Sequence, residues 1–345
     1  SICFLGITSD CPTTAGNLSR IAIQWSSSYT KCPGISWLII LVKIDSDIIG
    51  VLIVSYVHNG IIDTMTNYRM ADPLTENATV ELSSYSPFLQ QLLFARDLTT
   101  AQAAQDFLDP SFEDHLHDPF LLHDMDTAVT RILAAISAKE KIAIYSDYDC
   151  DGIPGGVVLH DFFKAIAYEN FINHIPHRHY DGFGLNESAV EKLAAEGVQL
   201  IITIDCGSTD VAPVARANEL GVDVIITDHH QVKEVVPEAL AIVNPQVGDT
   251  YPFKGLCGTG VIFKVIQALL HKGDFGLTPG WEKWWLDMVG VATIADMVPL
   301  RGENRALAFY GLQVLRKSRR PGLQQLLRKQ KASQAHLTED DIGFT

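Results

Sequence analysis

The sequence predicts an α/β fold in which a mostly parallel sheet of about five strands has helices on both faces and is followed by a helical segment. The first observation behind this prediction is a series of short, continuously apolar runs between residues 141 and 243. The second is that stretches with helical spacing of apolar residues separate these runs. Such an alternation is typical of a parallel sheet buried on both faces. From about Gly258 onward the pattern is mainly helical, which predicts the final segment.

Strands and helices alternate in a regular order through the middle of the chain. The predicted strands are residues 141–146, 171–175, 199–204, 222–227 and 239–243. The predicted helices of this region are residues 155–167, 185–195 and 211–220. Gly197 and Gly221 follow the second and third of these helices, and glycine commonly ends a helix because it adopts the left-handed conformation without strain. The later predicted helices are residues 261–270, 284–293, 305–315 and 323–328.

The segment before residue 70 differs from the rest of the chain. Residues 1–69 are rich in Ser, Thr and Ile and show no clear helical or strand period. One interpretation is that the start is misassigned: translation begins at Met65 or Met70, and the preceding residues are an atypical extension. The other is a small β-rich appendage built on the β-branched runs 39–42 and 48–54. The other regions are a helical N-terminal region at 70–140, an α/β domain at 141–300 and a helical C-terminal segment at 301–345.

Composition indicates a globular chain that does not bind nucleic acid over its whole surface. With 345 residues, of which 47% are hydrophobic and 19% charged, the chain can bury a substantial core. A formal net charge of −15 restricts phosphate contacts to a local or metal-assisted site, because such contacts need Lys and Arg. Six cysteines without a CxxC pair fit reduced thiols, and the N-terminus shows no signal-peptide pattern. We therefore expect a cytoplasmic protein.

The apolar stretch at about 35–57 is not expected to cross a membrane. Lys43, Asp45 and Asp47 lie in its middle. Each of these charges would cost about 2.5 to 3.5 kcal/mol at the centre of a bilayer. The stretch therefore fits a soluble segment better than a membrane span.

Acidic and histidine side chains directly follow three of the predicted strands. The carboxyl ends of parallel strands meet at one edge of the sheet, where ligands bind. So many carboxylates at one edge repel one another unless a cation lies among them. Oxygen-rich ligation with one or two imidazoles suits Mn²⁺ or Mg²⁺, and the carboxylates suffice for two ions about 3.5 to 4 Å apart. These residues are Asp147, Asp149, Asp151, Asp205, Asp228, His229 and His230.

Each of these motifs alone has a simpler explanation. An Asp at a strand end is commonly a helix N-cap. A lone His is more often structural than a ligand, and Gly207 can serve only to turn the chain. Because several such motifs follow successive strands of one α/β pattern, a metal site is the better interpretation.

The same motifs resemble those of a known family. DYDCDG (147–152), IDCG (204–207), TDHH (227–230) and ATIADMVPL (292–300) are similar to the four motifs of the DHH phosphoesterase family, in their usual order. Strings between and after them resemble the RecJ branch of this family, which acts on single-stranded DNA. The resemblance covers roughly residues 85–330. The branch-specific strings are IPHR (175–178), DGFGLN (181–186), VNPQ (243–246), YPFKGLCGTGVIFK (251–264) and ENRALAFYGL (303–312).

The resemblance implies a ligand set for two Mn²⁺ or Mg²⁺ ions. Asp205 matches the position that bridges the two ions, and His230 would face the scissile phosphate as an electrostatic stabiliser or proton donor. The roles of Asp147 and Asp228 stay open: each could be a metal ligand or a hydrogen-bond acceptor that orients a ligand. The matched metal ligands are Asp149, Asp151, Asp205, His229 and Asp296.

The resemblance also implies contacts with the substrate. Arg178, preceded by His177, matches a position that contacts substrate phosphate. A guanidinium can bind a phosphate through bidentate hydrogen bonds. The alternative is a surface arginine paired with Asp181. Backbone N–H groups of Gly258 and Gly260 could bind a phosphate at a helix start, or these glycines could permit close packing. Asn304 and Arg305 match a further motif of the family.

The expected activity is hydrolysis of phosphodiester bonds in single-stranded DNA from the 5′ end, in repair and recombination. Within the family, the alternative is an enzyme that acts on short oligonucleotides, cyclic dinucleotides or polyphosphate. Outside enzymes, the alternative is a non-catalytic scaffold module. The expected partners are single-stranded DNA and a single-strand-binding protein or helicase, with the protein itself a monomer. Nothing after Lys331 resembles the family's second, substrate-binding domain, so we expect a truncated catalytic core.

Overall fold

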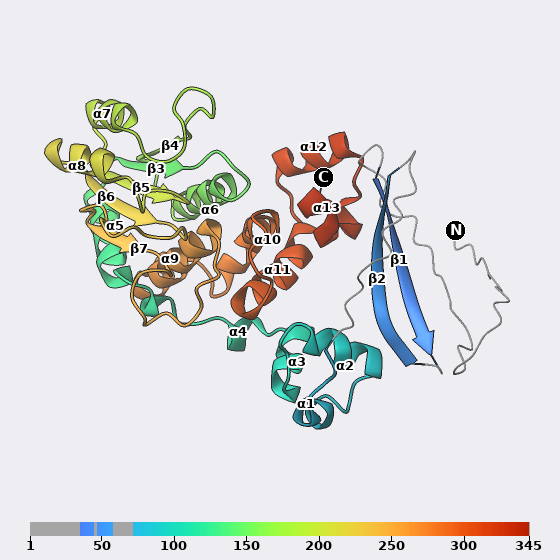
Figure 1. Ribbon diagram of the computed structural model, residues 1–345. Helices are drawn as coiled ribbons and strands as arrows, with labels where there is room; N and C mark the ends of the chain where they lie inside the picture. Colours follow the sequence, from blue (N-terminus) through green and yellow to red (C-terminus); the bar gives the residue numbers. More distant parts are fainter. Residues whose placement is uncertain (1–34, 45–46, 58–71, 345) are drawn as a thin grey trace. The chain divides into compact units, whose positions relative to one another are not determined.

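The computed structural model describes residues 35–44, 47–57 and 72–344 of the chain (Figure 1). The chain divides into two compact units, with the boundary between Gln105 and Asp106. The predicted region 70–140 is therefore shared between the two units. Met65 and Met70, the alternative starts of translation, lie outside the described residues.

The first unit contains a two-stranded hairpin and short helices. Strands β1 (Ile35–Ile44) and β2 (Asp47–Val57) pair antiparallel, with an irregularity after Val42. The two β-branched runs are therefore strands, as the β-rich interpretation predicted. The helices are α1 (Glu76–Glu81) and α2 (Pro87–Phe94), and α3 (Ala101–Leu108) spans the boundary between the units.

The second unit is built on a five-stranded sheet in which every neighbouring pair is parallel. This confirms the predicted fold class. The strand order is β4-β3-β5-β6-β7, so β3, β5 and β6 are adjacent in the middle. Their carboxyl ends are in register, with Ser146 opposite Ile204 and Ile204 opposite Thr227. The strands are β3 (Ile142–Ser146), β4 (Phe171–His174), β5 (Leu200–Ile204), β6 (Asp223–Thr227) and β7 (Ala241–Val243).

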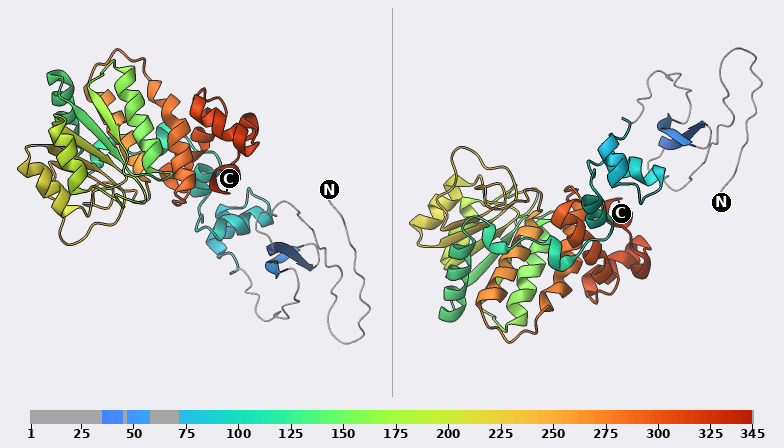
Figure 2. Two further views of the ribbon diagram at one scale, coloured as in Figure 1. Left: turned by 90° about the horizontal axis from the view of Figure 1, so that it is seen from above. Right: turned by 90° about the horizontal axis from the view of Figure 1, so that it is seen from below.

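Successive strand residues face opposite sides of the sheet and join two separate cores. Ile144 and Ile202 belong to the larger core, whereas Tyr145 and Ile201 belong to the smaller one. Helices therefore cover both faces of the sheet, as the ribbon views show (Figures 1 and 2). The larger core includes α5 (Met125–Ala138), α6 (Gly152–Ala165) and α9 (Gly258–Lys272), and the smaller one α7 (Glu187–Ala195) and α8 (Val211–Glu219).

The C-terminal part is helical, as predicted, and two of its helices cross at glycines. A Cβ atom placed on Gly290 would lie 2.8 Å from the Cα of Gly311, so the two backbones are in direct contact. These glycines lie in α10 (Leu286–Ala295) and α11 (Gly302–Leu315). The remaining elements are α4 (Phe112–His115), η1 (Pro119–Leu121), η2 (Trp281–Trp285), α12 (Pro321–Gln330), η3 (Gln334–His336) and α13 (Glu339–Phe344).

Four helices begin earlier than the sequence predicted: α11 at Gly302, α12 at Pro321, and the two that contribute to the site, α6 and α9, each at a glycine. Helix α6 begins at Gly152 rather than at residue 155, and α9 at Gly258 rather than at residue 261. A Cβ atom on Gly152 would lie 2.6 Å from the backbone oxygen of Asp147, and one on Gly258 would lie 2.6 Å from the Cβ of Asp205. Glycine is therefore required at these starts by close packing, despite its low helix propensity.

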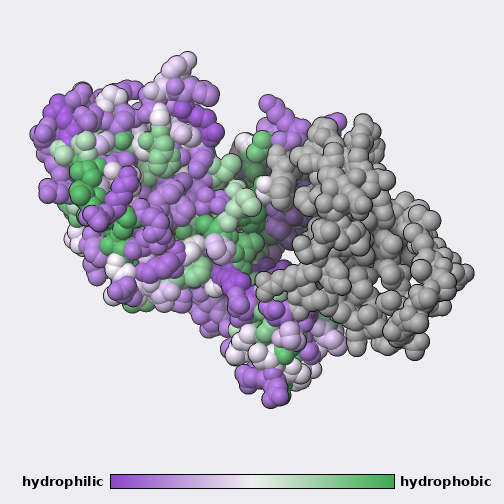
Figure 3. All heavy atoms as spheres, in the orientation of Figure 1, coloured by the Kyte–Doolittle hydropathy of each residue, from purple (hydrophilic) through white to green (hydrophobic). Residues whose placement is uncertain are grey.

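The surface of the second unit is mainly hydrophilic on the face seen in Figure 3, with apolar side chains in separate patches. None of the helices in the described ranges is both long and apolar enough to cross a membrane.

Candidate metal centre

The carboxyl ends of β3, β5 and β6 and the end of α10 bring seven acidic and imidazole side chains together. They form three overlapping groups, and in each group the potential ligand atoms all lie within 4.8 Å of one another. Asp205 belongs to two of the groups and His229 to two. The groups are Asp147 with Asp149 and Asp205; Asp205 with His229 and His230; and Asp151 with His229 and Asp296.

Asp205 lies at the centre of the cluster in an unusual backbone conformation. Its φ of +62° lies in the left-handed region, which costs a non-glycine residue energy and is common at functional sites. The side chain is buried, and its Oδ1 lies 3.2 Å from Nε2 of His229. This Oδ1 has no hydrogen-bond partner among the described residues. Burial, together with the nearby carboxylates of Asp151 and Asp149, raises the pKa of Asp205 to about 11.

Asp151 is held by the start of α9. Its Oδ2 accepts a hydrogen bond of 2.5 Å from the N–H of Gly258, and its Oδ1 accepts one of 2.7 Å from the N–H of Thr259. The Thr259 hydroxyl also donates to the backbone oxygen of Asp151 at 2.6 Å. The positive end of the helix dipole favours a charged carboxylate here. Asp151 is thereby fixed with Oδ2 at 3.7 Å from Nε2 of His229.

Asp149 and Asp147 complete the acidic loop after β3. Oδ1 of Asp149 accepts N–H bonds from Asp151 at 2.8 Å and from Gly152 at 2.9 Å, which fixes the turn into α6. Asp147 is buried, and its Oδ1 has no hydrogen-bond partner within the described ranges. Burial raises the pKa of Asp147, with the neighbouring Asp149 adding to the shift.

Asp228 contacts both histidines and is not a member of the three ligand groups. It accepts a hydrogen bond of 2.7 Å from the N–H of His229, and its contact with Nδ1 of His230 is also 2.7 Å. Its other oxygen accepts the N–H of Ser208 at 3.0 Å. Burial alone would raise the pKa of Asp228, but the His230 and Ser208 hydrogen bonds lower it to about 2. The same Asp228 hydrogen bond raises the pKa of His230.

Asp296 reaches the cluster from the C-terminal end of α10. Its Oδ2 lies 3.7 Å from Nε2 of His229. Burial and the nearby Asp151 raise its pKa to about 6, although His229 acts in the opposite direction. The next residue, Met297, has a φ of +59°, so the chain turns sharply directly after Asp296.

Arg178 and His177 lie in the exposed loop after β4. The Arg178 guanidinium lies over the ring of Tyr148, 4.6 Å from its centroid, in the acidic loop after β3. The described residues show no ion pair between Arg178 and Asp181; the Asp181 carboxylate accepts the N–H of His177 at 2.7 Å. The same loop carries Phe183, whose ring meets that of His230 edge-on at 5.7 Å between centroids.

Four predicted substrate-contacting residues have other roles in the structure. The N–H of Gly258 is bound to Asp151, and the N–H of Gly260 points at Sγ of Cys257 at 3.4 Å, so neither is directed at a substrate. Asn304 is fully buried. Arg305 donates from Nε to the backbone oxygen of Phe107 at 2.8 Å. The substrate contacts of these four groups stay a prediction, and the close approach of Gly258 to Asp205 fits the packing alternative.

Asn244 and Ser208, to which the sequence assigned no role in the site, contact His230 and Asp228. Asn244, directly after β7, donates from Nδ2 to Oγ of Ser208 and to the backbone oxygen of His230, both at 2.9 Å. Ser208 in turn donates its N–H to Asp228. The position of Asn244 at a strand end was the available signal, because the other site residues were found in that way.

A buried ion pair joins α9 to α11 behind the cluster. Nζ of Lys264 lies 2.5 Å from Oε1 of Glu303, and both side chains are fully buried. The hydroxyl of Tyr251 donates to Oε2 of Glu303, and Nζ of Lys264 donates to the backbone oxygen of His117. Removal of one partner from such a pair commonly costs about 3 to 5 kcal/mol. This ion pair therefore stabilises the packing of α9 against α11.

Residues 316–331 form a run rich in Arg and Lys, and some of these side chains are bound within the protein. Arg320 pairs with Asp287 at 2.8 Å and with Asp161 at 2.5 Å. Arg316 donates to the backbone oxygen of Leu337. Arg328 and other basic residues of the run are exposed.

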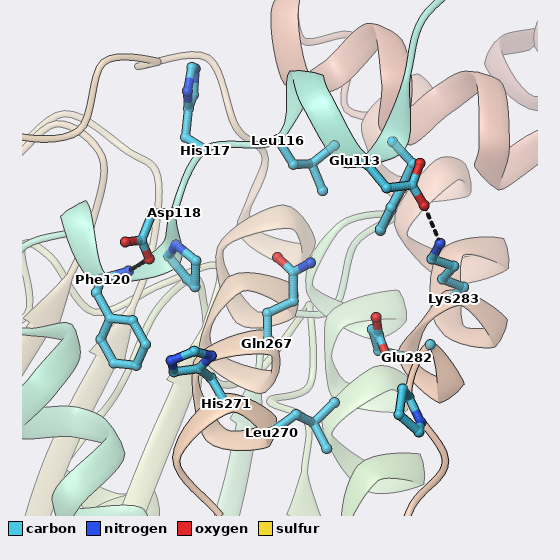
Figure 4. Close-up of a pocket in the computed structure, with 14 residues that line it drawn as sticks. Glu113, Leu116, His117, Asp118, Phe120, Gln267, Leu270, His271, Glu282 and Lys283 are labelled. Atoms are coloured by element: carbon cyan, nitrogen blue, oxygen red, sulfur yellow. Dashed lines mark hydrogen bonds and ion pairs between the residues drawn. The ribbon is translucent and has the colours of Figure 1, made fainter.

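A separate pocket of about 790 Å³ shares no residue with the cluster. It lies between α9, the segment around α4 and η1, and the start of η2 (Figure 4). Gln267 and His271 point from α9 toward it, and an ion pair of 2.6 Å between Glu113 and Lys283 lies at its rim.

Comparison with known proteins finds a family similar to the part of the chain that carries most of this site. The family described as "DHH family, N-terminal domain" matches residues 141–293, which include the acidic loop, Asp205 and both histidines. Residues 141–293 are therefore similar to the N-terminal domain of the DHH family. Asp296 lies just beyond the matched residues.

The chain is also similar to proteins named RecJ. It is 42% identical over 261 residues to the single-stranded-DNA-specific exonuclease RecJ of Bacillus subtilis, across 75% of this chain and 32% of that protein. The chain thus spans about a third of the length of this relative. A crystal structure of exonuclease RecJ bound to manganese matches with 32% identity and a TM-score of 0.58, over 65% of this chain and 55% of that one. RecJ of Thermus thermophilus in complex with Mn²⁺ matches with 27% identity and a TM-score of 0.63, over 78% of this chain and 37% of that one.

Proposed function

We propose that this chain is the metal-binding core of a nuclease that hydrolyses phosphodiester bonds in single-stranded DNA with two Mn²⁺ or Mg²⁺ ions. The observation that supports it most directly is the position of Asp205. Its buried oxygen has no hydrogen-bond partner in the described ranges, yet it lies where two ligand groups meet. A bridging carboxylate between two ions requires such an oxygen. The names of the similar exonucleases and the manganese-bound structures support the same substrate and metal.

The donor chemistry fits the proposed ions. Carboxylate oxygens dominate the cluster and imidazole nitrogens complete it, a set that suits Mn²⁺ and Mg²⁺ and contains no thiolate. Asp147, Asp149 and Asp205 would hold one ion, and Asp151, His229 and Asp296 would hold the second together with the bridging Asp205. Metal ions in such a pair activate water and stabilise charge on the attacking and leaving oxygens.

The protein side chains around the ions have separate roles in this proposal. His230, whose pKa the Asp228 hydrogen bond raises, would donate a hydrogen bond to a phosphate oxygen and stabilise the charge that develops there. Arg178, positioned over Tyr148, would bind a neighbouring phosphate of the strand. The aromatic ring beneath the guanidinium limits its motion, which favours a defined phosphate position.

The wider setting is part of the same proposal. It includes 5′-to-3′ polarity, a role in DNA repair and recombination, a cytoplasmic location, a monomeric state, and a single-strand-binding protein or helicase as partner. The resemblance of the motifs supports these points. The chain spans about a third of the length of the Bacillus subtilis relative, so the activity of a whole exonuclease is a proposal for this chain.

The test combines metal binding with strand cleavage. Asp205→Asn keeps the size of the side chain but removes its charge, so cleavage of a 5′-labelled single strand in Mn²⁺ should fall by at least about two orders of magnitude. Asp249→Asn, the same change at an exposed position outside the cluster, should leave the rate unchanged. Failure of the wild-type chain to bind Mn²⁺ in calorimetry would refute the proposal. Equal rates on dinucleotides and on the long strand would instead indicate a small-substrate phosphoesterase.

A further inference from the structure

Asn304 is a buried amide between two loops that lead to different parts of the cluster. Its Nδ2 donates to the backbone oxygen of Gly255 at 2.5 Å and to that of Pro299 at 3.1 Å. Both partners are carbonyl oxygens, so only the NH₂ end of the amide can face them. The side chain is fully buried and thus acts within the protein.

The first of these loops leads to Asp151. Gly255 lies three residues before Gly258, the first residue of α9. The N–H groups of Gly258 and Thr259 hold the two carboxylate oxygens of Asp151 at 2.5 and 2.7 Å. A shift of the loop at Gly255 would therefore move the start of α9 and the carboxylate bound to it.

The second loop leads to Asp296. Pro299 lies three residues after Asp296, and the intervening turn includes Met297 with its φ of +59°. Such a backbone conformation persists only where surrounding contacts hold it. The Pro299 oxygen also accepts the N–H of Arg301 at 2.8 Å, so Asn304 and the start of α11 together fix this turn.

We infer that Asn304 is a positioning residue, whose amide fixes the separation of Asp151 and Asp296 so that both are arranged for one cation before it binds. This inference rests on the proposed function, since it requires the metal site. Asp151 and Asp296 share one potential ligand group with His229, with all ligand atoms within 4.8 Å. Ligands that outer contacts hold in place bind metal more tightly than ligands that must be ordered on binding.

The test variant is Asn304→Leu, which removes both hydrogen bonds at a similar side-chain size. Mn²⁺ titration by calorimetry should show two ions in the wild type, and in the variant the affinity of one ion should fall by about 10- to 100-fold. In electron paramagnetic resonance, the signal of a coupled Mn²⁺ pair should weaken at a metal concentration that saturates the wild type. Asp296→Asn, a direct ligand change, should shift the titration in the same direction.

Ser318→Ala is the matched control. It removes another buried hydrogen bond, of 2.7 Å from Oγ to Oδ2 of Asp287, near the start of α10 and far along the helix from Asp296. This control should lower the melting temperature and leave both Mn²⁺ affinities unchanged. If Asn304 had only a structural role, Asn304→Leu would likewise lower the melting temperature and leave both Mn²⁺ affinities unchanged.

The outcomes separate the inference from the function on which it rests. Wild-type affinity for both ions in a folded Asn304→Leu protein would overturn the inference, while loss of binding in Asp205→Asn would leave the proposed function standing. If the wild-type chain binds no Mn²⁺, the inference about Asn304 and the proposed function are both refuted. If Asn304→Leu does not fold, Asn304→Ser provides the same measurement with less steric disturbance, and an unchanged titration there also overturns the inference.

Discussion

At the scale of single residues, the protonation of His230 depends on Asp228. The pKa of Asp228 would be raised by burial, but the hydrogen bonds that it receives lower it to about 2. The carboxylate is therefore ionised at neutral pH, and its hydrogen bond raises the pKa of His230. A histidine held in this way keeps its proton to a higher pH than an isolated one.

Asp228→Asn tests this coupling. The neutral amide no longer favours the imidazolium form, so the pKa of His230 should fall. The alkaline loss of nuclease activity should then move to lower pH, and the maximal rate should fall by about 10- to 100-fold, as for other groups that orient active-site residues. A pH profile at saturating Mn²⁺ measures both effects. Asp287→Asn, the same change at a buried Asp outside the cluster, should keep the pH profile of the wild type. If Asp228→Asn also kept that pH profile, the coupling between Asp228 and His230 would be contradicted.

The sequence predicted which residues would meet but not what each would touch. Asp149, Asp205 and His229 follow strands of one parallel sheet, and parallel topology alone brings their positions to one edge. Hydrogen-bond partners depend on side-chain directions that strand order does not specify. For that reason the sequence left Asp228 open as ligand or acceptor, and assigned the buried Asn304 to the substrate.

At the scale of elements, the start of α9 is pressed against the strand end that carries Asp205. A Cβ atom on Gly258 would lie 2.6 Å from the Cβ of Asp205 and 2.7 Å from its Oδ1. The helix start also donates two N–H bonds to Asp151. One backbone segment thus fixes two carboxylates that arise from different strands.

Gly258→Ala tests this close approach. Alanine is the better helix former by about 1 kcal/mol, so propensity alone predicts a gain in stability. The clash with Asp205 should instead lower the free energy of unfolding by about 1 to 3 kcal/mol. Mn²⁺ affinity should fall with it. Urea unfolding and calorimetry provide the two measurements.

Gly322→Ala is the control for that experiment. Gly322 lies in the first turn of α12, and a Cβ atom there would have nothing within 4 Å. This change should be neutral or slightly stabilising and should leave metal binding unchanged. If Gly258→Ala were also stabilising, the backbone around Gly258 would have adapted to the added Cβ atom. The close approach of Gly258 to Asp205 would then not be required.

The helix starts also show the limit of sequence patterns for elements. Apolar spacing predicted that α6 and α9 exist, because their interior residues face a large core. Their first turns contain glycines, which propensity assigns to loops. The long-range packing that requires glycine there joins residues such as Gly258 and Asp205 that are far apart in the chain, and a local pattern does not contain that information. The same holds for the contact between Gly290 and Gly311.

At the scale of the whole molecule, the acidic cluster opposes folding when no cation is bound. The chain has a net charge of −15, and burial places several carboxylates close together at one edge of the sheet. Burial and neighbouring carboxylates raise the pKa of Asp296 to about 6 and that of Asp205 to about 11, each from an ordinary value of 3.8. In the metal-free protein these groups therefore retain protons that the unfolded chain releases.

The sign of the resulting pH dependence follows from this difference in bound protons. Between an ordinary pKa of 3.8 and the raised folded value, the folded state binds more protons than the unfolded state, so the free energy of unfolding falls as pH rises. The contribution of Asp296 is fully present below its ordinary pKa and is lost as pH passes about 6, whereas that of Asp205 continues to decline at higher pH. Divalent ions replace these protons and bind better once the protons have left.

Mn²⁺ should therefore raise the melting temperature of the full chain more at alkaline than at acidic pH. In EDTA the melting temperature should decline as pH rises from about 5 to 8, because the carboxylates lose protons without gaining a counter-charge. In excess Mn²⁺ that decline should be reduced or abolished, since binding to the folded state alone stabilises it by mass action. Thermal scans across this range with and without Mn²⁺ measure the difference, and Asp205→Asn should reduce it. A gain from Mn²⁺ that is the same at every pH would show that the ions do not compete with protons at these carboxylates, and would place their binding elsewhere on the chain.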